Sequence, residues 1–232
     1  VDGKGILDKG DEVVIWTTTP WTIPANLAVC VNPDFEYSLI SVNGRNLVVA
    51  KELAAKFVEI IGANEYKEIK TFSGRKLEYV TYEHPLFGLD KVCPVILGNH
   101  VTLDAGTGLV HTAPGHGEDD FNVGKAYNLG DFCPVDGRGM MTSDAGEFEG
   151  MFYEKANDAI IEKLEQTGHL LHKAEIVHSY PHDWRTKKPI IFRTTPQWFA
   201  SIEGLKKDMM QAISDVKWIP SWGEVRLGNM VK

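Results

Sequence analysis

The stretch "DEVVIWTTTPWTIPANLAVCVN" (residues 11–32) decides the fold. Its two ends, 11–19 and 26–32, are rich in β-branched residues, which are typical of strands. Pro20 lacks an amide hydrogen, and it disfavours helical geometry at Thr19. The chain is therefore expected to leave a sheet after Thr19, turn, and enter a second strand. The hydroxyl groups of the turn would then face one cavity, whereas successive side chains of a strand point to opposite faces.

Strands also dominate the sequence on either side of this stretch. β-branched or alternating segments predict strands at 37–42, 46–50, 66–72, 77–82, 92–97 and 106–113, and "VNGRN" (42–46) predicts a hairpin turn. Helical spacing of apolar residues predicts helices at 51–62, 119–129, 154–167 and 196–215. Strands and helices do not alternate regularly, so we expect an α+β fold with a mostly antiparallel, barrel-like β core and peripheral helices.

Charge divides the chain into two parts. Residues 1–172 hold 14 basic and 26 acidic residues, a net charge of −12, and residues 173–232 hold 10 basic and 6 acidic residues, a net charge of +4. The overall charge of −8 argues against a broad nucleic-acid platform. We expect a core domain over 1–172 and a basic extension over 173–232. If a polyanion binds the chain, this extension is where it would make contact, and a solvated basic helix explains the asymmetry equally well. Because the chain begins with Val1, we also expect a piece of a longer protein.

Membrane and disulfide classes are not indicated by the sequence. No apolar run approaches the 18 residues or so of a membrane-spanning helix. The three cysteines, Cys30, Cys93 and Cys133, form no C-x-x-C pair, so neither a disulfide framework nor a thiolate zinc site is expected. A reduced, cytoplasmic and monomeric chain is the expectation, with each cysteine a small buried residue.

The first group of candidate site residues is "WTTTPWTIPAN" (16–26). Three adjacent hydroxyl groups can donate and accept hydrogen bonds, and their methyl groups give a cavity a partly apolar wall. An isolated threonine in a strand usually reflects β propensity alone. Three of them before a proline, between two indoles, favour a binding cavity.

The second group is "GTGLVHTAPGHGEDDF" (106–121), in which a strand delivers His111 to a Pro-Gly loop. The acidic residues at 118–120 suit a helix N-terminus, which explains at least two of them. The remaining carboxylate could face a cavity and hold a cation. A metal held by His111, His116 and Asp119 or Asp120 is an alternative, although H-x4-H in a loop is a weak pattern.

The third group is "HSYPHDWRTKKPIIFRTTPQWF" (178–199), which mixes aromatic and basic residues. That mixture fits contact with a nucleic acid, and it fits a packed surface ribbon equally well. Phosphate-binding loops and the serine nucleophile elbow are absent from the sequence. The chain therefore offers no good activated serine or cysteine nucleophile.

Together with "PVDGRGMM" (134–141), these motifs resemble, in order and spacing, the editing insertion (CP1) of bacterial-type isoleucyl-tRNA synthetases. The resemblance covers nearly all 232 residues. Related valyl and leucyl enzymes carry arginine before the motif's proline, where this chain has Thr19. The H-x-G-H and K-M-S-K-S motifs are absent. ATP, magnesium and isoleucine activation would therefore belong to the parent synthetase, and no cofactor is expected in this chain.

The resemblance implies post-transfer proofreading, the hydrolysis of mischarged Val-tRNA(Ile) with exclusion of Ile-tRNA(Ile). The implied partners are the tRNA(Ile) 3′ end carrying valine and the rest of the synthetase, toward which residues 173–232 would return. Thr17, Thr18, Thr19 and Asp120 carry over as catalytic-site residues, with Asp120 holding the substrate ammonium. Trp21, Asn26 and His111 carry over as substrate-binding residues, with His111 at the side-chain end of the pocket.

One position pair departs from the wider family. Some relatives carry a zinc-binding C-x-x-C where this chain has Asp183 and Thr186, so we expect no zinc, and polar contacts of Asp183 with Arg185 or Lys187 in its place. Two other functions remain open at this point. One is a metal-dependent hydrolase that uses His111, His116 and Asp120, and the other is a non-catalytic tRNA-binding module.

Overall fold

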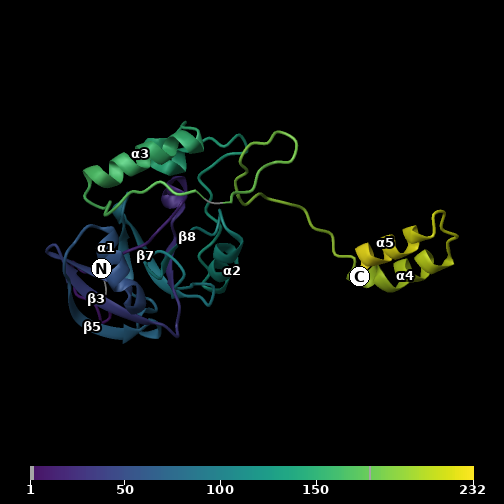
Figure 1. Ribbon diagram of the computed structural model, residues 1–232. Coiled ribbons are helices and arrows are strands. Elements are labelled where there is room, and N and C mark those ends of the chain that lie inside the picture. The colour runs from purple at the N-terminus through teal and green to yellow at the C-terminus, as the bar shows by residue number, and fades with distance from the viewer. Residues whose placement is uncertain (1–2, 178) are drawn as a thin grey trace. The chain divides into compact units, whose positions relative to one another are not determined.

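The computed structural model describes residues 3–177 and 179–232 (Figure 1). The chain forms two compact units, Val1–Thr194 and Thr195–Lys232. His178 of the third motif lies outside the described residues. In the described part, every helix is too short or too polar to cross a membrane.

The first sheet of the N-terminal unit has the order β1-β4-β3-β5. Its strands are β1 (Glu12–Val13), β3 (Glu36–Val42), β4 (Arg45–Ala50) and β5 (Lys67–Ser73). β3 and β4 form the predicted hairpin, and both turn residues, Asn43 and Gly44, have positive φ, at 52° and 77°. Asn-Gly is the pair that such a two-residue turn favours, which confirms the hairpin prediction.

The second sheet carries most of the candidate site, with the order β6-β7-β2-β8. Its strands are β2 (Ala28–Val31), β6 (Thr81–His84), β7 (Gly88–Leu97) and β8 (Leu109–Thr112). β2 pairs parallel to β7 and antiparallel to β8. Four of the six strand pairs in the two sheets are antiparallel.

The barrel-like core that we predicted needs correction, because the described strands form two separate sheets that do not close. The sheets approach each other on one side, where Trp16, just after β1, makes a single bridge to Val110 of β8. On the other side the edge strands β5 and β6 do not pair. The 3-10 helix η3 (Gly74–Leu77) lies between these two strands in the chain.

The two sheets share one hydrophobic core, which includes Leu39 and Val48 from the first and Val29 and Val95 from the second. The helices cover the outside: α1 (Ala54–Ile60) packs on the first sheet and α2 (Glu118–Ala126) on the second. α3 (Tyr153–Gln166) covers a smaller core that includes Trp21. The remaining 3-10 helices in this unit are η1 (Pro20–Ala25), η2 (Lys51–Leu53) and η4 (Ser143–Phe148).

The C-terminal unit is a pair of helices, α4 (Lys206–Asp215) and α5 (Trp222–Val231), preceded by η5 (Glu203–Leu205). The predicted helix over 196–215 therefore begins about ten residues too early. Trp198, placed on its apolar stripe, is fully exposed, whereas Ile213 is buried. An apolar stripe stabilises a helix only where it packs, and here packing begins with α4.

Residues 173–194, assigned to the basic extension, contact the N-terminal unit through hydrogen bonds such as Thr194 N–H to Gly115 O at 2.9 Å. The division at residue 172 stays a prediction. The turn at 181–190 is closed by polar contacts: the Asp183 carboxylate accepts from Thr186 N–H at 2.5 Å, and Lys187 N–H donates to Asp183 O. Asp183 and Thr186 are the pair that departs from the zinc motif.

Tyr37 allows the stability of this core to be tested. Its buried hydroxyl group accepts a hydrogen bond from Asn32 N–H and donates one to Gly108 O, both at 2.9 Å. Tyr37→Phe leaves both backbone groups unpaired, which should lower the free energy of unfolding by about 1–3 kcal/mol. Urea unfolding of the 232-residue chain measures this, with Tyr66→Phe at an exposed position as the control. Equal midpoints for Tyr37→Phe and wild type would contradict it.

Candidate functional site

The threonine motif forms a tight turn, as predicted, although the strand before it ends earlier than predicted. β1 ends at Val13, and Pro20 begins η1 directly after the threonines. Thr17 Oγ1 accepts a hydrogen bond from Thr19 N–H at 3.0 Å, which turns the backbone away from strand geometry. The hydroxyl oxygens of Thr17 and Thr19 lie 3.4 Å apart, so both point into the same space.

Thr22 extends this row of hydroxyl groups. Its Oγ1 lies 3.4 Å from Thr19 Oγ1 and donates to Thr19 O at 2.9 Å. Thr18 is exposed and lies outside the row. Thr17, Thr19 and Thr22 therefore form one connected, partly buried row of hydroxyl groups.

The carbonyl groups of η1 are held by basic side chains from the second sheet. His84 Nε2 donates to Ile23 O at 3.0 Å, and Lys91 Nζ donates to Pro24 O at 3.2 Å. Burial lowers the pKa of His84 to about 3, so this imidazole is neutral over the physiological range. These contacts tie η1 to the second sheet, and Ile23 O also accepts a hydrogen bond from Asn26 N–H at 2.9 Å.

His111 is the centre of a directed hydrogen-bond network. Tyr82 O–H donates to Asn26 Oδ1 at 2.5 Å, and Asn26 Nδ2 lies 2.7 Å from His111 Nδ1. The amide can only donate there, so Nδ1 is the acceptor and Nε2 carries the proton. Nε2 then donates to Thr22 Oγ1 at 3.0 Å. Burial lowers the pKa of His111 to about 4, which keeps this neutral tautomer in place.

The position of His111 follows from strand alternation. Leu109 and His111 occupy the face of β8 that lies over the shared core, while Val110 packs toward α2. His111 is paired with Val29 of β2, and 8% of its surface is exposed. An imidazole therefore occupies a core-facing position of β8, at the end of the strand that is nearest the threonine turn.

Asp120 is held at the same end of β8. Its Oδ2 accepts from Ala113 N–H at 2.9 Å, two residues beyond His111. Burial raises the pKa of Asp120, although the Ala113 N–H and the nearby His100 act in the opposite direction. Its other oxygen, Oδ1, makes no hydrogen bond with the described residues. Asp120 lies in the first turn of α2 with Glu118 and Asp119, both exposed.

The structure thus brings part of the predicted site together. Thr17, Thr19, Asn26 and His111 form one connected set, and Asp120 is attached to the loop that follows His111. Trp21 instead packs into the core under α3, against Tyr153 at 5.3 Å and against His116 at 4.9 Å between ring centres.

Three residues of the site were not predicted from the sequence. Thr22 belongs to the quoted motif, and its spacing of three from Thr19 was the available signal. Tyr82 and His100 lie in other segments and carry no local pattern that links them to Asn26 or Asp120. Their segments come near the site only because β6 pairs with β7, and β7 pairs with β2.

The geometry around His116 bears on the metal alternative. Both nitrogens of His111 are used inside the protein, and His116 Nδ1 donates to Phe192 O at 2.9 Å. Among the described residues, no group of three or more His, Cys, Asp or Glu side chains is arranged to hold a metal ion.

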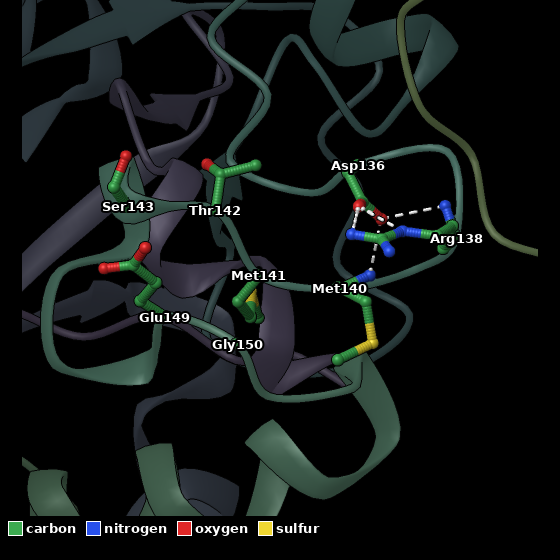
Figure 2. Close-up of a pocket in the computed structure, with 8 residues that line it drawn as sticks. All are labelled: Asp136, Arg138, Met140, Met141, Thr142, Ser143, Glu149 and Gly150. Atoms are coloured by element: carbon green, nitrogen blue, oxygen red, sulfur yellow. Dashed lines mark hydrogen bonds and ion pairs between the residues drawn. The ribbon is translucent and has the colours of Figure 1, made fainter.

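Two surface pockets lie outside the threonine turn. One, of about 500 Å³, is formed by residues of the 136–150 segment. Figure 2 shows its ends, with the Asp136–Arg138 ion pair on the right and Ser143 and Glu149 on the left. The other, of about 380 Å³, lies beside Lys91, between Phe87 and Phe132. Neither contains Asp120 or the threonine hydroxyl groups.

Comparison with known proteins gives consistent matches. The family model of class I tRNA synthetases (I, L, M and V) matches residues 1–232. The chain is 60% identical over 221 residues to isoleucine–tRNA ligase of Acholeplasma laidlawii, covering 95% of the chain and 24% of that protein. It is 55% identical over 231 residues to the Bacillus subtilis enzyme, covering 100% of the chain and 25% of that protein. The chain thus spans about a quarter of these relatives.

Solved structures of similar fold agree with this. The crystal structure of GlLeuRS-CP1 aligns with a TM-score of 0.56 at 17% identity, covering 75% of this chain and 87% of that one. The P. knowlesi cytosolic leucyl-tRNA synthetase editing domain aligns with a TM-score of 0.51 at 10% identity, covering 67% of this chain and 81% of that one. At these identities the likeness concerns the fold alone. The chain belongs to the class I tRNA synthetases of the isoleucine, leucine, methionine and valine group, as a segment of isoleucine–tRNA ligase type that resembles CP1 editing domains.

Proposed function

We propose that this chain hydrolyses the aminoacyl ester of Val-tRNA(Ile) and spares Ile-tRNA(Ile), as the proofreading unit of an isoleucine–tRNA ligase. One observation carries the proposal: the threonine hydroxyl row and the Asp120 carboxylate are both held at the end of β8, through His111 and Ala113. A row of hydroxyl groups beside a single carboxylate suits a substrate with an ester at one end and an ammonium group next to it.

The need for such a site follows from binding energies. A hydrophobic pocket gains only about 1–3 kcal/mol from one additional methylene group, and isoleucine against valine is the standard example of that limit. A pocket that activates isoleucine therefore accepts some valine. A second pocket that is too small for isoleucine can remove the product, because exclusion by size does not depend on the lost methylene contact.

The proposed reaction is hydrolysis by water. Water attacks the ester carbonyl carbon, the bond to the ribose oxygen breaks, and that oxygen takes up a proton. Thr17 and Thr19 would position the water or stabilise the negative charge that develops on the carbonyl oxygen. The vicinal ribose hydroxyl group can assist the leaving oxygen. This assigns positioning and electrostatic roles to the protein, with no resident nucleophile and no metal ion.

Asp120 would bind the substrate ammonium group. Its free oxygen Oδ1 can accept from an ammonium donor while Oδ2 keeps its bond to Ala113 N–H. Burial raises the pKa of the Asp120 carboxyl group, and a bound cation would favour its ionised form. An ammonium group at this position would align the ester with the hydroxyl row.

The deciding experiment is a deacylation assay of the 232-residue chain on Val-tRNA(Ile) and Ile-tRNA(Ile), with and without EDTA. We expect release of valine well above the uncatalysed rate, little release of isoleucine, and no effect of the chelator. Loss of activity with EDTA would favour a metal-dependent hydrolase. Binding of tRNA without release of either amino acid would favour a non-catalytic binding module.

A further inference from the structure

Residues 181–190 form a surface turn, the basic turn, whose backbone is held by its own hydrogen bonds. Asp183 N–H donates to Lys188 O at 2.9 Å. Outside this pair, Ile190 N–H donates to Pro181 O at 3.1 Å. Apart from Asp183, every residue of the basic turn is exposed. The turn therefore has a defined backbone and presents its side chains to solvent.

The charged side chains of the basic turn are mostly cationic. Arg185, Lys187 and Lys188 stand against the single carboxylate of Asp183, which is turned inward to Thr186 N–H. None of the three cations forms an ion pair with the described residues. Lys187 has a φ of 59°, in the left-handed region that suits glycine. Residues held in such a strained conformation cluster at functional sites.

Trp184 adds a flat apolar surface beside these cations. It is 73% exposed, and the guanidinium group of Arg185 lies over its ring, 4.8 Å from the ring centre. A packed surface ribbon would bury the indole and pair the cations, and the basic turn does neither among the described residues. Cations for phosphate groups beside an aromatic ring for a base are the combination with which proteins bind RNA strands.

The basic turn is attached to the loop that carries the candidate site. Directly after the turn, Phe192 O accepts from His116 Nδ1, and Thr194 N–H donates to Gly115 O, both at 2.9 Å. The loop over 113–117 joins β8 to the helix that holds Asp120. A strand of RNA on the basic turn would therefore lie on a segment that is bonded to the candidate site.

The remainder of this unit would repel RNA. Residues 1–172 have a net charge of −12, and Glu118 and Asp119 are exposed carboxylates directly beside Asp120. A polyanion that reaches the candidate site needs a nearby cationic surface to offset this repulsion. The basic turn supplies three cations on the segment that contacts the site loop.

We infer that the basic turn binds the phosphate backbone at the acceptor end of tRNA, with Trp184 stacked on a base. The bound turn holds the aminoacylated 3′ end beside the threonine row and Asp120. This inference deepens the proposed function and rests on it for the identity of the RNA. Lys187 and Lys188 contact phosphate groups, and Arg185 supports the indole from one side.

Filter binding of uncharged tRNA(Ile) to the 232-residue chain tests the basic turn, because it requires no ester hydrolysis. The double variant Lys187→Gln/Lys188→Gln should weaken binding about tenfold, and the slope of log affinity against log salt should fall by about 2, roughly 1 for each lost phosphate contact. Lys56→Gln/Lys67→Gln, at two exposed lysines outside the turn, changes the net charge equally and should have little effect. An equal loss in both double variants would overturn the inference.

Trp184→Ala should weaken binding at least about fivefold and leave the salt slope unchanged, because stacking releases no counterions. Trp198→Ala, at a fully exposed indole outside the turn, is the control. If wild type does not bind tRNA, or if both the lysine and the Trp184 variants bind it normally, the turn is not an RNA surface. Normal binding would instead favour a protein partner for the turn.

Deacylation separates this inference from the proposed function. With Val-tRNA(Ile) as substrate, Lys187→Gln/Lys188→Gln should raise KM and leave kcat nearly unchanged, because the lysines contact only the RNA backbone. Binding of tRNA through the turn without release of valine would support the RNA surface and contradict the proposed function. Release of valine with the same KM in this variant and wild type would support the function and overturn the role of the turn.

Discussion

Asp120→Ala is expected to lower the rate of Val-tRNA(Ile) deacylation at least about a hundredfold. In the proposed reaction the carboxylate anchors the ammonium group, and a substrate that is misplaced by about 1 Å can lose that much. The loss should appear with both substrates, because valine and isoleucine share the ammonium group. Asp119→Ala is the matched control, since Asp119 lies in the same first turn of α2 and is exposed.

Alanine at 120 also removes the acceptor of the Ala113 N–H hydrogen bond, so its effect could be structural. Asp120→Asn separates the two roles. The asparagine side-chain oxygen can still accept from Ala113 N–H, but it carries no negative charge for the ammonium group. We expect Asp120→Asn to unfold at the same urea concentration as wild type and to be nearly as inactive as Asp120→Ala. Normal turnover by Asp120→Asn would exclude the anchor role.

The local sequence predicted the strands well where β-branched runs end at turn residues. The Asn43-Gly44 hairpin is an example, because its geometry depends on two adjacent residues that tolerate positive φ. The first strand was predicted too long. β1 ends at Val13, and only the Val14 N–H bond to Val48 O and the Trp16–Val110 bridge follow it. Further on, the Thr17 hydroxyl group accepts from Thr19 N–H, a contact that competes with sheet pairing.

The predictions of a barrel-like core and of the C-terminal helices differ from the structure for another reason. Whether two sheets close depends on which edge strands meet, and no pattern within β5 or β6 carries that information. α5 was not predicted, because Gly223 and Gly228 lower its intrinsic propensity. Its stability comes from packing against α4, which is a contact between segments.

The candidate site was predictable where one motif holds several of its members. The resemblance named Asn26 and His111, and the structure joins them directly at 2.7 Å. It could not show that Thr22 and Tyr82 complete the network around His111, since these hydrogen bonds join η1 to the strands β6 and β8. The residue roles themselves remain predictions that the variants described here test.

His111→Ala is expected to relax the size limit of the pocket. Removing the ring leaves a void beside Thr22 and releases Asn26 from its bond to Nδ1. The threonine row is tied to β8 through Thr22, so it can then move outward and admit one more methylene group. We expect the ratio of isoleucine to valine release to rise roughly tenfold, within the range of one methylene contact. Parallel deacylation of Val-tRNA(Ile) and Ile-tRNA(Ile) measures this.

A general loss of stability must be separated from a loss of discrimination, and His84 provides the comparison. Both imidazoles are buried with lowered pKa values, and both support the turn, His84 through Ile23 O and His111 through Thr22. Only His111 bonds to the hydroxyl row. His84→Ala should therefore lower the unfolding midpoint and leave the isoleucine-to-valine ratio unchanged. If His111→Ala behaves in the same way, the imidazole supports the fold and does not set the size of the pocket.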